Sequence, residues 1–250
     1  MTIGEPILWL DTTTSTMDDA ARLAADGAPE GLVVVADEQT AGRGRAGRSW
    51  VAPRGTSLLL SILLRPLLPA SRLLTLPLVT GVAVAEAVEQ CAGVRCHLKW
   101  PNDVLIDERK LAGILTSTKA SVTGGTAVIV GVGINVTTPD AALPPGAISL
   151  LTATGIAHDR RSLIYVLLTR FTARYEEFLA SGGQPDLAAW TDRAAYLGAI
   201  VDVQEGSQTI TGRFLGIDAS GALQLELADG RLRRVVSGDL VRGPRLSDHP

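Results

Sequence analysis

Residues 40–50 read TAGRGRAGRSW, and the rest of the chain is organised around this stretch. It holds three glycines and three arginines and ends on Trp50. The apolar run GLVVVA at residues 31–36 precedes it, and TSLLLSILLR at residues 56–65 follows it. Both runs are typical of buried β-strands. The sequence therefore predicts a cationic loop that joins two strands.

The composition of this loop favours binding of an anion. Glycine lets the backbone approach a ligand closely, and arginine presents a planar, permanently charged fork that suits carboxylates and phosphates. Trp50 adds a flat face on which a base can stack. The three guanidinium groups repel one another, so we expect the loop to be mobile in the free protein and ordered around an anion.

Two other interpretations of the loop remain open. Gly42, Gly44 and Gly47 spell G-x-G-x-x-G, the dinucleotide-binding pattern, but that pattern needs a helix at the last glycine and an acidic residue about twenty positions later. Here RSWVAPRGTS follows without helical periodicity, and residues 63–67 are LLRPL. A solvated surface loop is the second alternative, although solubility alone explains poorly why arginine and glycine are interleaved.

Length and composition indicate a globular cytoplasmic protein. The chain has 250 residues, 46% of them hydrophobic, and a net charge of −3, so no overall basic bias points to nucleic acid. No basic residue precedes Arg22, which argues against a secretory signal, and the longest uncharged apolar run, residues 73–85, is too short to span a bilayer. Cys91 and Cys96 form no metal pattern, and we expect two reduced, mostly buried thiols.

Lysine is rare in this chain. The 23 basic residues include only Lys99, Lys110 and Lys119, which leaves 20 arginines. A chain that uses arginine wherever a positive charge suffices keeps a lysine where a compact ammonium is needed. Lys99 and Lys110 lie within one twelve-residue stretch, which marks that stretch as a candidate site.

Short strands joined by tight turns predict a mainly antiparallel sheet. Glycines inside two of the expected strands, at Gly113, Gly131 and Gly133, favour close approach of a ligand or another backbone. In addition to the two strands beside the loop, we expect strands at residues 7–10, 95–100, 104–106, 110–118 and 126–136, with turns at 101–103 and 107–109.

Helices are expected between these strands and after them. Ser15 or Thr16 caps a first helix that ends at Gly27, and a binding role for the two hydroxyls is equally open. Further helices are expected at residues 74–89, from Asp159 to about residue 179, and at 186–196. The third of these four helices carries side chains at helical spacing that we expect to be core: Tyr165, Leu168, Phe171, Tyr175 and Phe178.

The sequence pattern of the chain changes after Gly198. Short alternating strands follow, some separated by the hairpin signals Glu205-Gly206 and Asp229-Gly230. Residues 197 to about 245 are therefore expected to form a small β-barrel.

Four segments and one tripeptide, in this combination, resemble the biotin–protein ligase family. They are STM at residues 15–17, GRGRAGRSW at 42–50, KWPNDVLI at 99–106, KLAGIL at 110–115 and GVGINV at 131–136. The resemblance implies an α+β fold: a class II synthetase-like catalytic domain at residues 1–196, with a mixed, mainly antiparallel sheet and helices, and an SH3-like β-barrel at 197–250. It also implies a two-step reaction, in which biotin and ATP form biotinyl-5′-AMP and biotin then passes to a lysine of a biotin carboxyl carrier protein.

The residues suit this chemistry. The biotin carboxylate and the α-phosphate of ATP are both anions, so fixed positive charge from Arg43, Arg45 and Lys110, together with Mg²⁺, is expected to offset their repulsion. Carried over from the family, the expected biotin-binding residues are Ser15, Thr16, Met17, Gln39, Arg43, Gly44, Arg45, Lys110 and Gly113. The expected ATP-binding residues are Arg45, Trp50, Lys99, Asn102, Asp103, Lys110 and Asn135, and no residue is expected to hold a metal ion by itself.

Within these sets, Trp50 is expected to cover the adenine and Asn135 to bond to its edge. Lys99 and Asp103 would lie beside the phosphates or support Lys110, while a turn-stabilising role for Asp103 is equally open. His97 is expected to be structural.

The sequence departs from the family pattern in two respects. Met17 stands where the family usually has asparagine, so a contact from its backbone is expected rather than one from its side chain. Only fourteen residues precede Ser15, so the DNA-binding domain of the bifunctional members is expected to be absent. A lipoate–protein ligase and a non-enzymatic biotin-sensing module are the alternatives. The expected partner is the carrier domain of a carboxylase, with a homodimer left open, and neither nucleic acid nor a membrane is expected.

Overall fold

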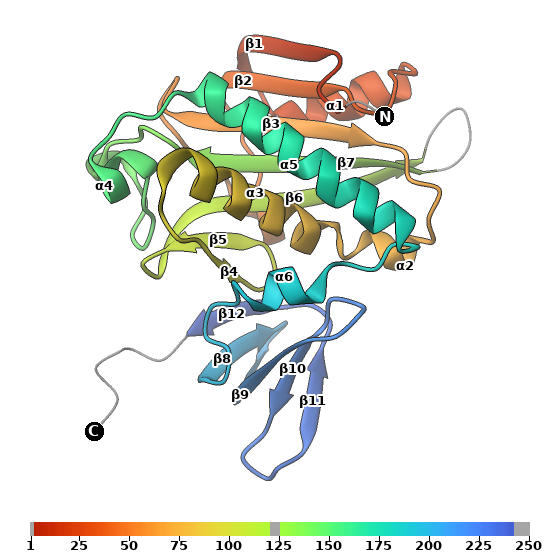
Figure 1. Ribbon diagram of the computed structural model, residues 1–250, viewed down its shortest axis with the longest axis vertical. Coiled ribbons are helices and arrows are strands. Elements are labelled where there is room, and N and C mark those ends of the chain that lie inside the picture. The colour runs from red at the N-terminus through yellow and green to blue at the C-terminus, as the bar shows by residue number, and fades with distance from the viewer. Residues whose placement is uncertain (1–2, 121–125, 243–250) are drawn as a thin grey trace.

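The computed structural model describes residues 3–120 and 126–242, which form two sheets of different size (Figure 1). A seven-stranded sheet has the order β1-β2-β3-β7-β6-β5-β4, and a five-stranded sheet follows it in the chain. Only β1 and β2 pair in parallel within the larger sheet. The fold class expected from the sequence is confirmed: a mixed, mainly antiparallel sheet with helices precedes a small antiparallel β module.

The strands and helices have the following bounds. The larger sheet contains β1 (Ile7–Thr13), β2 (Val33–Gln39), β3 (Ser57–Leu64), β4 (His97–Lys99), β5 (Asp103–Ile106), β6 (Arg109–Ala120) and β7 (Thr126–Asn135). The helices are α1 (Thr16–Ala25), α2 (Ala70–Leu73), α3 (Leu76–Ala92), α4 (Leu150–Thr154), α5 (Arg160–Ala180) and α6 (Leu187–Thr191). The smaller sheet contains β8 (Ile200–Glu205), β9 (Gln208–Ile217), β10 (Leu223–Glu226), β11 (Leu232–Val235) and β12 (Asp239–Arg242).

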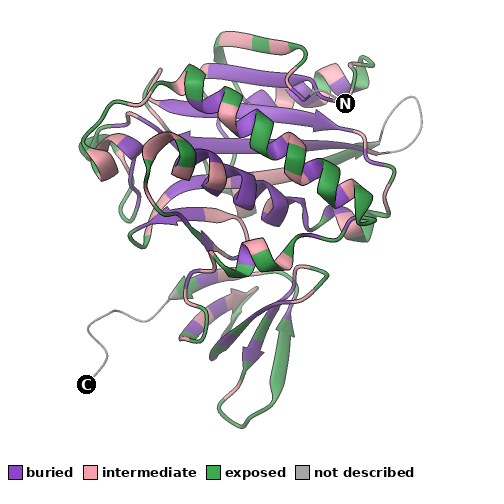
Figure 2. Ribbon diagram, in the orientation of Figure 1, coloured by how far each residue is buried: buried purple, intermediate pink, exposed green. Residues whose placement is uncertain are grey.

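Both faces of the larger sheet are covered, but not equally. Helices α3 and α5 pack across one face and bury most of it, although β1 at its edge stays partly exposed, as Figure 2 shows. On the other face, α1 covers mainly β2, β3 and β7, through a smaller cluster around Met17, Ala20 and Val34. Consecutive residues of β2, such as Val33 and Val34, therefore pack into different hydrophobic cores on the two faces of the sheet, which explains the unbroken apolar run of this strand.

Among the described residues, one stretch, Ala70–Ala92, has a length and hydropathy compatible with a membrane span, and it comprises α2 and α3. Its most apolar 18-residue window has a mean hydropathy of 1.4, and 72% of that window is buried inside the protein. Helix α3 packs against α5 and β6, so it is the central helix of the core.

Several local expectations are corrected. Tyr165 is 59% exposed because Ile164, one residue earlier, takes the buried position on α5. The last expected helix ends at Thr191 rather than at residue 196, since residues 193 and 195 hydrogen-bond to Leu98 of β4. The short elements α2, α4 and β12 were not expected. The proposed end of the β module at about residue 245 lies outside the described residues.

Candidate active site

A pocket lies on the face of the sheet that α1 leaves partly open, and two cross-strand rows form its floor. One row runs through Leu59, Gly133 and Gly113 and continues beyond the pocket to Asp103. The next row begins at Ser61, outside the lining, and runs through Gly131 and Leu115. The glycines leave room above the sheet because they carry no side chains. A Cβ atom on Gly133 would lie 2.6 Å from the Trp50 ring, and one on Gly131 would lie 2.8 Å from the Met17 sulfur. Side chains of Trp50 and Met17, rather than another backbone, make the close approach at these two glycines, and the approach of a ligand stays a prediction.

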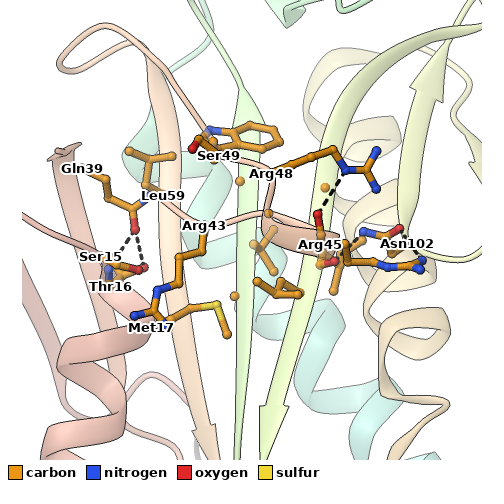
Figure 3. Close-up of a pocket in the computed structure, with 18 of the residues that line it drawn as sticks. Ser15, Thr16, Met17, Gln39, Arg43, Arg45, Arg48, Ser49, Leu59 and Asn102 are labelled. Carbon is orange, nitrogen blue, oxygen red and sulfur yellow. Dashed lines mark hydrogen bonds between the residues drawn. The ribbon is translucent and has the colours of Figure 1, made fainter. Parts of the chain in front are cut away.

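The start of α1 forms one wall of the pocket (Figure 3). The backbone N–H of Thr16 donates a hydrogen bond to the side-chain oxygen of Gln39, 2.8 Å away. The Thr16 hydroxyl also donates to Gln39 and forms a hydrogen bond with the Ser61 hydroxyl. Ser15 occupies the N-cap position, but its hydroxyl makes no capping hydrogen bond. That hydroxyl is buried and has no partner among the described residues. Buried polar atoms are normally paired, so Ser15 Oγ is free to bond a ligand.

The glycine loop closes the pocket as a narrow hairpin. Gly44 donates to the Arg48 carbonyl, and Trp50 donates to the Gly42 carbonyl. Ala46 and Gly47 turn the chain with φ values of 52° and 74°, and the positive φ suits glycine. The chain after the last glycine is not an α-helix, as a dinucleotide fold would require.

Each arginine of the loop has its own polar partner. Arg43 pairs with Asp18 at 2.7 Å, and Arg48 pairs with Asp239 at 2.9 Å. Arg45 donates to the carbonyl of Gly238 at 3.1 Å and to the side-chain oxygen of Asn102 at 3.4 Å. The expectation that the three guanidinium groups repel one another until an anion binds is therefore corrected, because carboxylates already offset the repulsion.

Lys110 brings an ammonium group to the floor of the pocket. Its Nζ lies 2.7 Å from Asp103 Oδ1, an ion pair that is not aligned as a hydrogen bond, and 5.8 Å from the centre of the Trp50 ring. The ion pair is consistent with support of Lys110, one of the three roles expected for Asp103. Burial lowers the pKa of Lys99, and although Asp103 opposes this shift, the nearby charge of Lys110 adds to it.

Most of the expected site residues meet in this pocket, which encloses about 680 Å³ if the part open to solvent is counted. Pockets of this size hold small ligands. The expected residues that line it are Ser15, Thr16, Met17, Gln39, Arg43, Gly44, Arg45, Trp50, Asn102, Lys110 and Gly113. The sequence did not single out Arg48, Ser49, Leu59, Leu60, Ile114, Leu115 or Val132, which also line it, and it marked Gly131 and Gly133 only as points of close approach.

Three expected residues lie outside the lining. Asp103 pairs with Lys110, and Lys99 lies close enough to both for their charges to act on its pKa. Asn135 follows Gly133 on the same face of β7, but it is buried, and its side chain donates to the Ile148 carbonyl and accepts from Ser57. One amide N–H of Asn135 is left for a ligand.

The missed residues are mostly apolar and follow from strand register. Leu115 lies two positions after Gly113 on β6, and Leu59 lies opposite Gly133. Side chains of a strand alternate between its two faces, so Leu115 could have been identified from its spacing to Gly113. Leu59 could not, because its place beside the pocket depends on the pairing of β3 with β7, two strands far apart in the chain.

The pocket has three chemically different parts. Hydroxyl and amide groups lie at the α1 end, where Arg43 also pairs with Asp18, and apolar side chains lie along the floor. Arg45 and Lys110 bring two cations to the other side, next to Asn102 and Asp103. Such a pocket suits an elongated ligand with a neutral polar head, an apolar middle and an anionic end.

Comparisons with known proteins agree with this geometry. The model of the biotin/lipoate A/B protein ligase family matches residues 9–135, and that of the biotin protein ligase C terminal domain matches residues 196–243. The chain belongs to the biotin/lipoate A/B protein ligase family.

Relatives in this family include enzymes of similar length. The chain is 39% identical to the biotin–[acetyl-CoA-carboxylase] ligase of Paracoccus denitrificans, covering 89% of this chain and 95% of that protein. It is 37% identical to the enzyme of the same name from Mycobacterium tuberculosis, with coverages of 92% and 86%. The bifunctional ligase/repressor BirA of Bacillus subtilis is 37% identical, over 96% of this chain and 75% of that protein.

A solved structure of the family superposes well on this chain. The biotin protein ligase from Aquifex aeolicus in complex with biotin and ATP gives a TM-score of 0.82 at 32% identity, covering 96% of this chain and all of that one. The family membership thus covers both the catalytic sheet and the small β module.

Proposed function

We propose that this chain is an ATP-dependent, AMP-forming biotin–protein ligase that activates biotin as biotinyl-5′-AMP and transfers it to a lysine of a biotin carboxyl carrier protein. The observation that carries the proposal is the three-part pocket, in which the free Ser15 hydroxyl lies at one end of an apolar floor and the cations Arg45 and Lys110 lie at the other. The names of the Paracoccus and Mycobacterium relatives support the reaction, and the ligands of the Aquifex complex support the two substrates.

Biotin has a neutral ureido ring, an apolar chain and a carboxylate, which match the three parts of the pocket. The ureido ring needs donors and acceptors, and Ser15, Thr16 and Gln39 supply both. Met17 and Gly113 border the apolar chain. The carboxylate points toward Arg43, Gly44, Arg45 and Lys110.

Adenylation requires two anions to react with each other. The carboxylate oxygen of biotin attacks the α-phosphorus, and pyrophosphate leaves. Arg45 and Lys110 neutralise the charge on the two reacting groups, and Lys110 exchanges its contact with Asp103 for one with the substrate. Trp50 covers the adenine, while Asn102, Lys99 and the remaining N–H of Asn135 complete the nucleotide site.

Transfer follows from the reactivity of the mixed anhydride. The ε-amine of the carrier lysine attacks the biotinyl carbonyl, and AMP leaves. A closed glycine loop excludes water from the anhydride until that amine enters. The carrier domain of acetyl-CoA carboxylase is the proposed partner, and the reaction takes place in the cytoplasm; a homodimer stays a prediction.

The described residues of the pocket supply no ready set of ligands for magnesium. Among the described residues no three His, Cys, Asp or Glu side chains cluster, and Asp18, Asp103 and Asp239 each pair with a cation. We propose that magnesium enters as its complex with ATP, where it shields the phosphate charges.

We further propose that residues 1–196 form the catalytic domain and residues 197–250 the β module. A lipoate–protein ligase shares the family, but the match to a C-terminal domain named for biotin protein ligases favours biotin.

Exchange of labelled pyrophosphate into ATP tests the proposal. We expect exchange to depend on biotin and to stay at background with lipoate. Exchange that depends on lipoate, or on neither compound, would contradict the assignment.

A further inference from the structure

The last strand of the β module reaches the glycine loop. β12 lies on the side of the module that faces the larger sheet (Figure 1), and it begins at Asp239. Asp239 Oδ2 lies 2.9 Å from Arg48 Nη2, and its Oδ1 lies 3.6 Å from Arg45 Nη1. The neighbouring carbonyl of Gly238 accepts a hydrogen bond from Arg45 at 3.1 Å. Residues about 190 positions apart in the chain therefore meet at one edge of the pocket.

These contacts fix Arg45 without cancelling its charge. Arg45 is the more buried of the two guanidinium groups, with 25% of its side chain exposed against 58% for Arg48. The closer partner of Asp239 is Arg48, so Arg48 takes up most of its negative charge. Asn102 and the Gly238 carbonyl, both neutral, supply the hydrogen bonds of Arg45. Its positive charge thus remains available to an anion in the pocket.

We propose that Asp239 is a positioning residue for adenylation, through which the C-terminal β module aims Arg45 at the phosphates of ATP. Arg48 serves as the counter-ion of Asp239, so the carboxylate orients Arg45 but does not neutralise it. The proposal rests on the function proposed above and deepens it, because the nucleotide site is incomplete without a residue from the second module.

Replacement of the carboxylate provides the first test. Asp239→Ala is expected to raise the KM for ATP in biotin-dependent pyrophosphate exchange by about tenfold, because Arg45 loses the carboxylate that orients it. The KM for biotin should rise less, since Arg43 and Lys110 also face the biotin carboxylate. Asp229→Ala is the matched control, since Asp229 lies in the same module and pairs only within its hairpin, with Arg231. Equal effects of the two variants, or equal changes in both KM values, would overturn the proposal.

The counter-ion role of Arg48 makes a second, sharper prediction. Arg48→Gln leaves the Asp239 carboxylate free to neutralise Arg45, so the KM for ATP should rise. Adding Asp239→Asn removes that charge, so the double variant should bind ATP better than Arg48→Gln alone. Additive losses in the double variant would show that the two residues do not act on each other.

A third readout does not depend on catalysis. Asp239 anchors the loop at Arg48, so trypsin should cut after Arg48 faster in unliganded Asp239→Ala than in wild-type or Asp229→Ala protein. Equal cleavage in all three would contradict the anchoring. If the wild-type protein lacks biotin-dependent exchange but the cleavage difference is present, the proposed function fails while the contact between the modules stands.

Discussion

At the scale of single residues, Lys110 links the sequence to the chemistry. It is one of three lysines beside twenty arginines, and its ammonium lies between Asp103 and the Trp50 ring. A Cβ on Gly113 would lie 3.2 Å from Lys110 Nζ, so the ammonium has little free space on that side. A guanidinium group is wider and planar, and it does not fit the same place.

Lys110→Arg is therefore expected to keep the fold but to lose most adenylate formation. Loss of a charged hydrogen bond costs about 1.5–3 kcal/mol, or roughly 10- to 100-fold in rate. Biotin-dependent pyrophosphate exchange and the melting temperature measure the two effects. Lys119→Arg, at an exposed position of the same strand, is the control. Near-normal exchange in Lys110→Arg would refute the assigned role.

Asp218 of the β module provides a pH-dependent prediction. Desolvation opposes its ionisation, but hydrogen bonds from Arg234, Ser220 and backbone N–H groups outweigh this and lower its pKa from 3.8 to about 2. A carboxyl whose pKa is lowered in the folded state stabilises the protein above its unfolded pKa, and this stabilisation is lost as the pH falls from about 4 to about 2.

Carboxyl titration followed by NMR measures this pKa. Arg234→Gln is expected to raise the pKa of Asp218 and to weaken the loss of stability in acid. Arg231→Gln, which removes a guanidinium that pairs with Asp229 instead, should leave the pKa of Asp218 at about 2. A pKa that does not respond to Arg234→Gln would show that the hydrogen bond contributes little.

At the scale of elements, the arginines of the glycine loop can exchange carboxylates of the protein for an anionic substrate. Its arginines are held by Asp18 and Asp239, and anionic substrates compete for the same guanidinium groups. These pairs are partly exposed, and such pairs contribute only about 0–1 kcal/mol each. The loop is therefore expected to open readily in the free protein and to close over the adenylate.

Limited trypsin digestion measures this opening. Cuts after Arg43, Arg45 and Arg48 should come first in the free protein, and biotin plus ATP should slow them several-fold. A cut after Arg231, in the exposed hairpin between β10 and β11, should be unaffected. Equally fast cuts in the loop with and without substrates would mean that it does not close on the intermediate.

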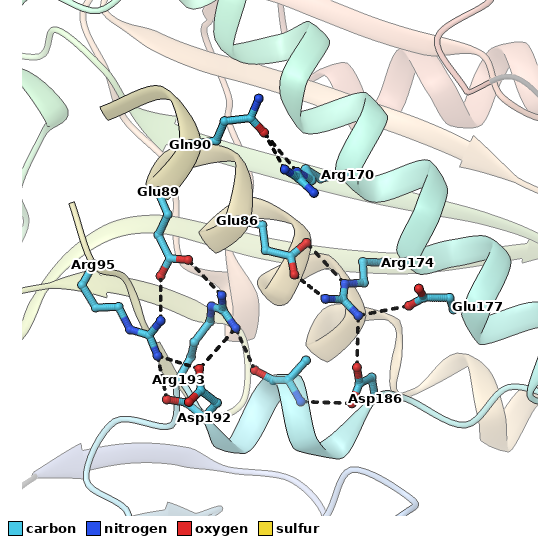
Figure 4. A network of polar contacts seen from close by, with 11 residues as sticks. Glu86, Glu89, Gln90, Arg95, Arg170, Arg174, Glu177, Asp186, Asp192 and Arg193 are labelled. Atoms are coloured by element: carbon cyan, nitrogen blue, oxygen red, sulfur yellow. Dashed lines mark hydrogen bonds and ion pairs between the residues drawn. The ribbon is translucent and has the colours of Figure 1, made fainter. Parts of the chain in front are cut away.

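A network of ion pairs joins three helices on the opposite face of the sheet (Figure 4). Arg174 of α5 bonds Glu86 of α3, and it lies 3.0 Å from both Glu177 and Asp186. Asp186 also caps α6 by accepting from the Ala189 N–H. Arg174 thus fixes α6, which leads into the β module.

Arg174→Leu should destabilise the protein by about 2–4 kcal/mol, because Glu86 then remains mostly buried without its cation. Arg170→Leu removes an exposed guanidinium that bonds only neutral Gln90, and it should cost less than about 1 kcal/mol. Urea unfolding compares the two variants. Equal losses of stability would show that the network adds little beyond surface pairing.

Elements with a strong pattern could be predicted from the sequence, and weakly patterned ones could not. The apolar runs of β2, β3 and β7 could be predicted as strands, since both faces of these runs are largely buried. β12 spans only DLVR, too short for alternation to stand out, and α4 is a single turn and a half.

The residues of the candidate site also differ in whether the sequence could predict them. Residues with distinctive chemistry, such as Arg43, Arg45 and Lys110, could be chosen from their types and spacing alone. The part played by Asp239 could not, because it depends on how the two modules pack. Asn135 is drawn into a hydrogen bond with the Ile148 carbonyl by a loop whose path the sequence does not specify.

At the scale of the whole molecule, the larger sheet supplies the pocket and the β module closes one edge of it. The junction between them includes the Trp100 indole N–H, which donates to the Gly221 carbonyl at 3.0 Å, and the contacts of Arg45 and Arg48. We therefore expect activation and transfer to take place at one site to which both modules contribute.

Intact-mass analysis of an acceptor protein tests this account most directly. Purified protein, biotin and ATP are mixed with the lysine-bearing carrier domain of an acetyl-CoA carboxylase. The account predicts a mass increase of one biotinyl group on that lysine, dependent on ATP, and no modification when lipoate replaces biotin. An unmodified carrier in the presence of biotin and ATP, or a lipoylated one, would contradict it.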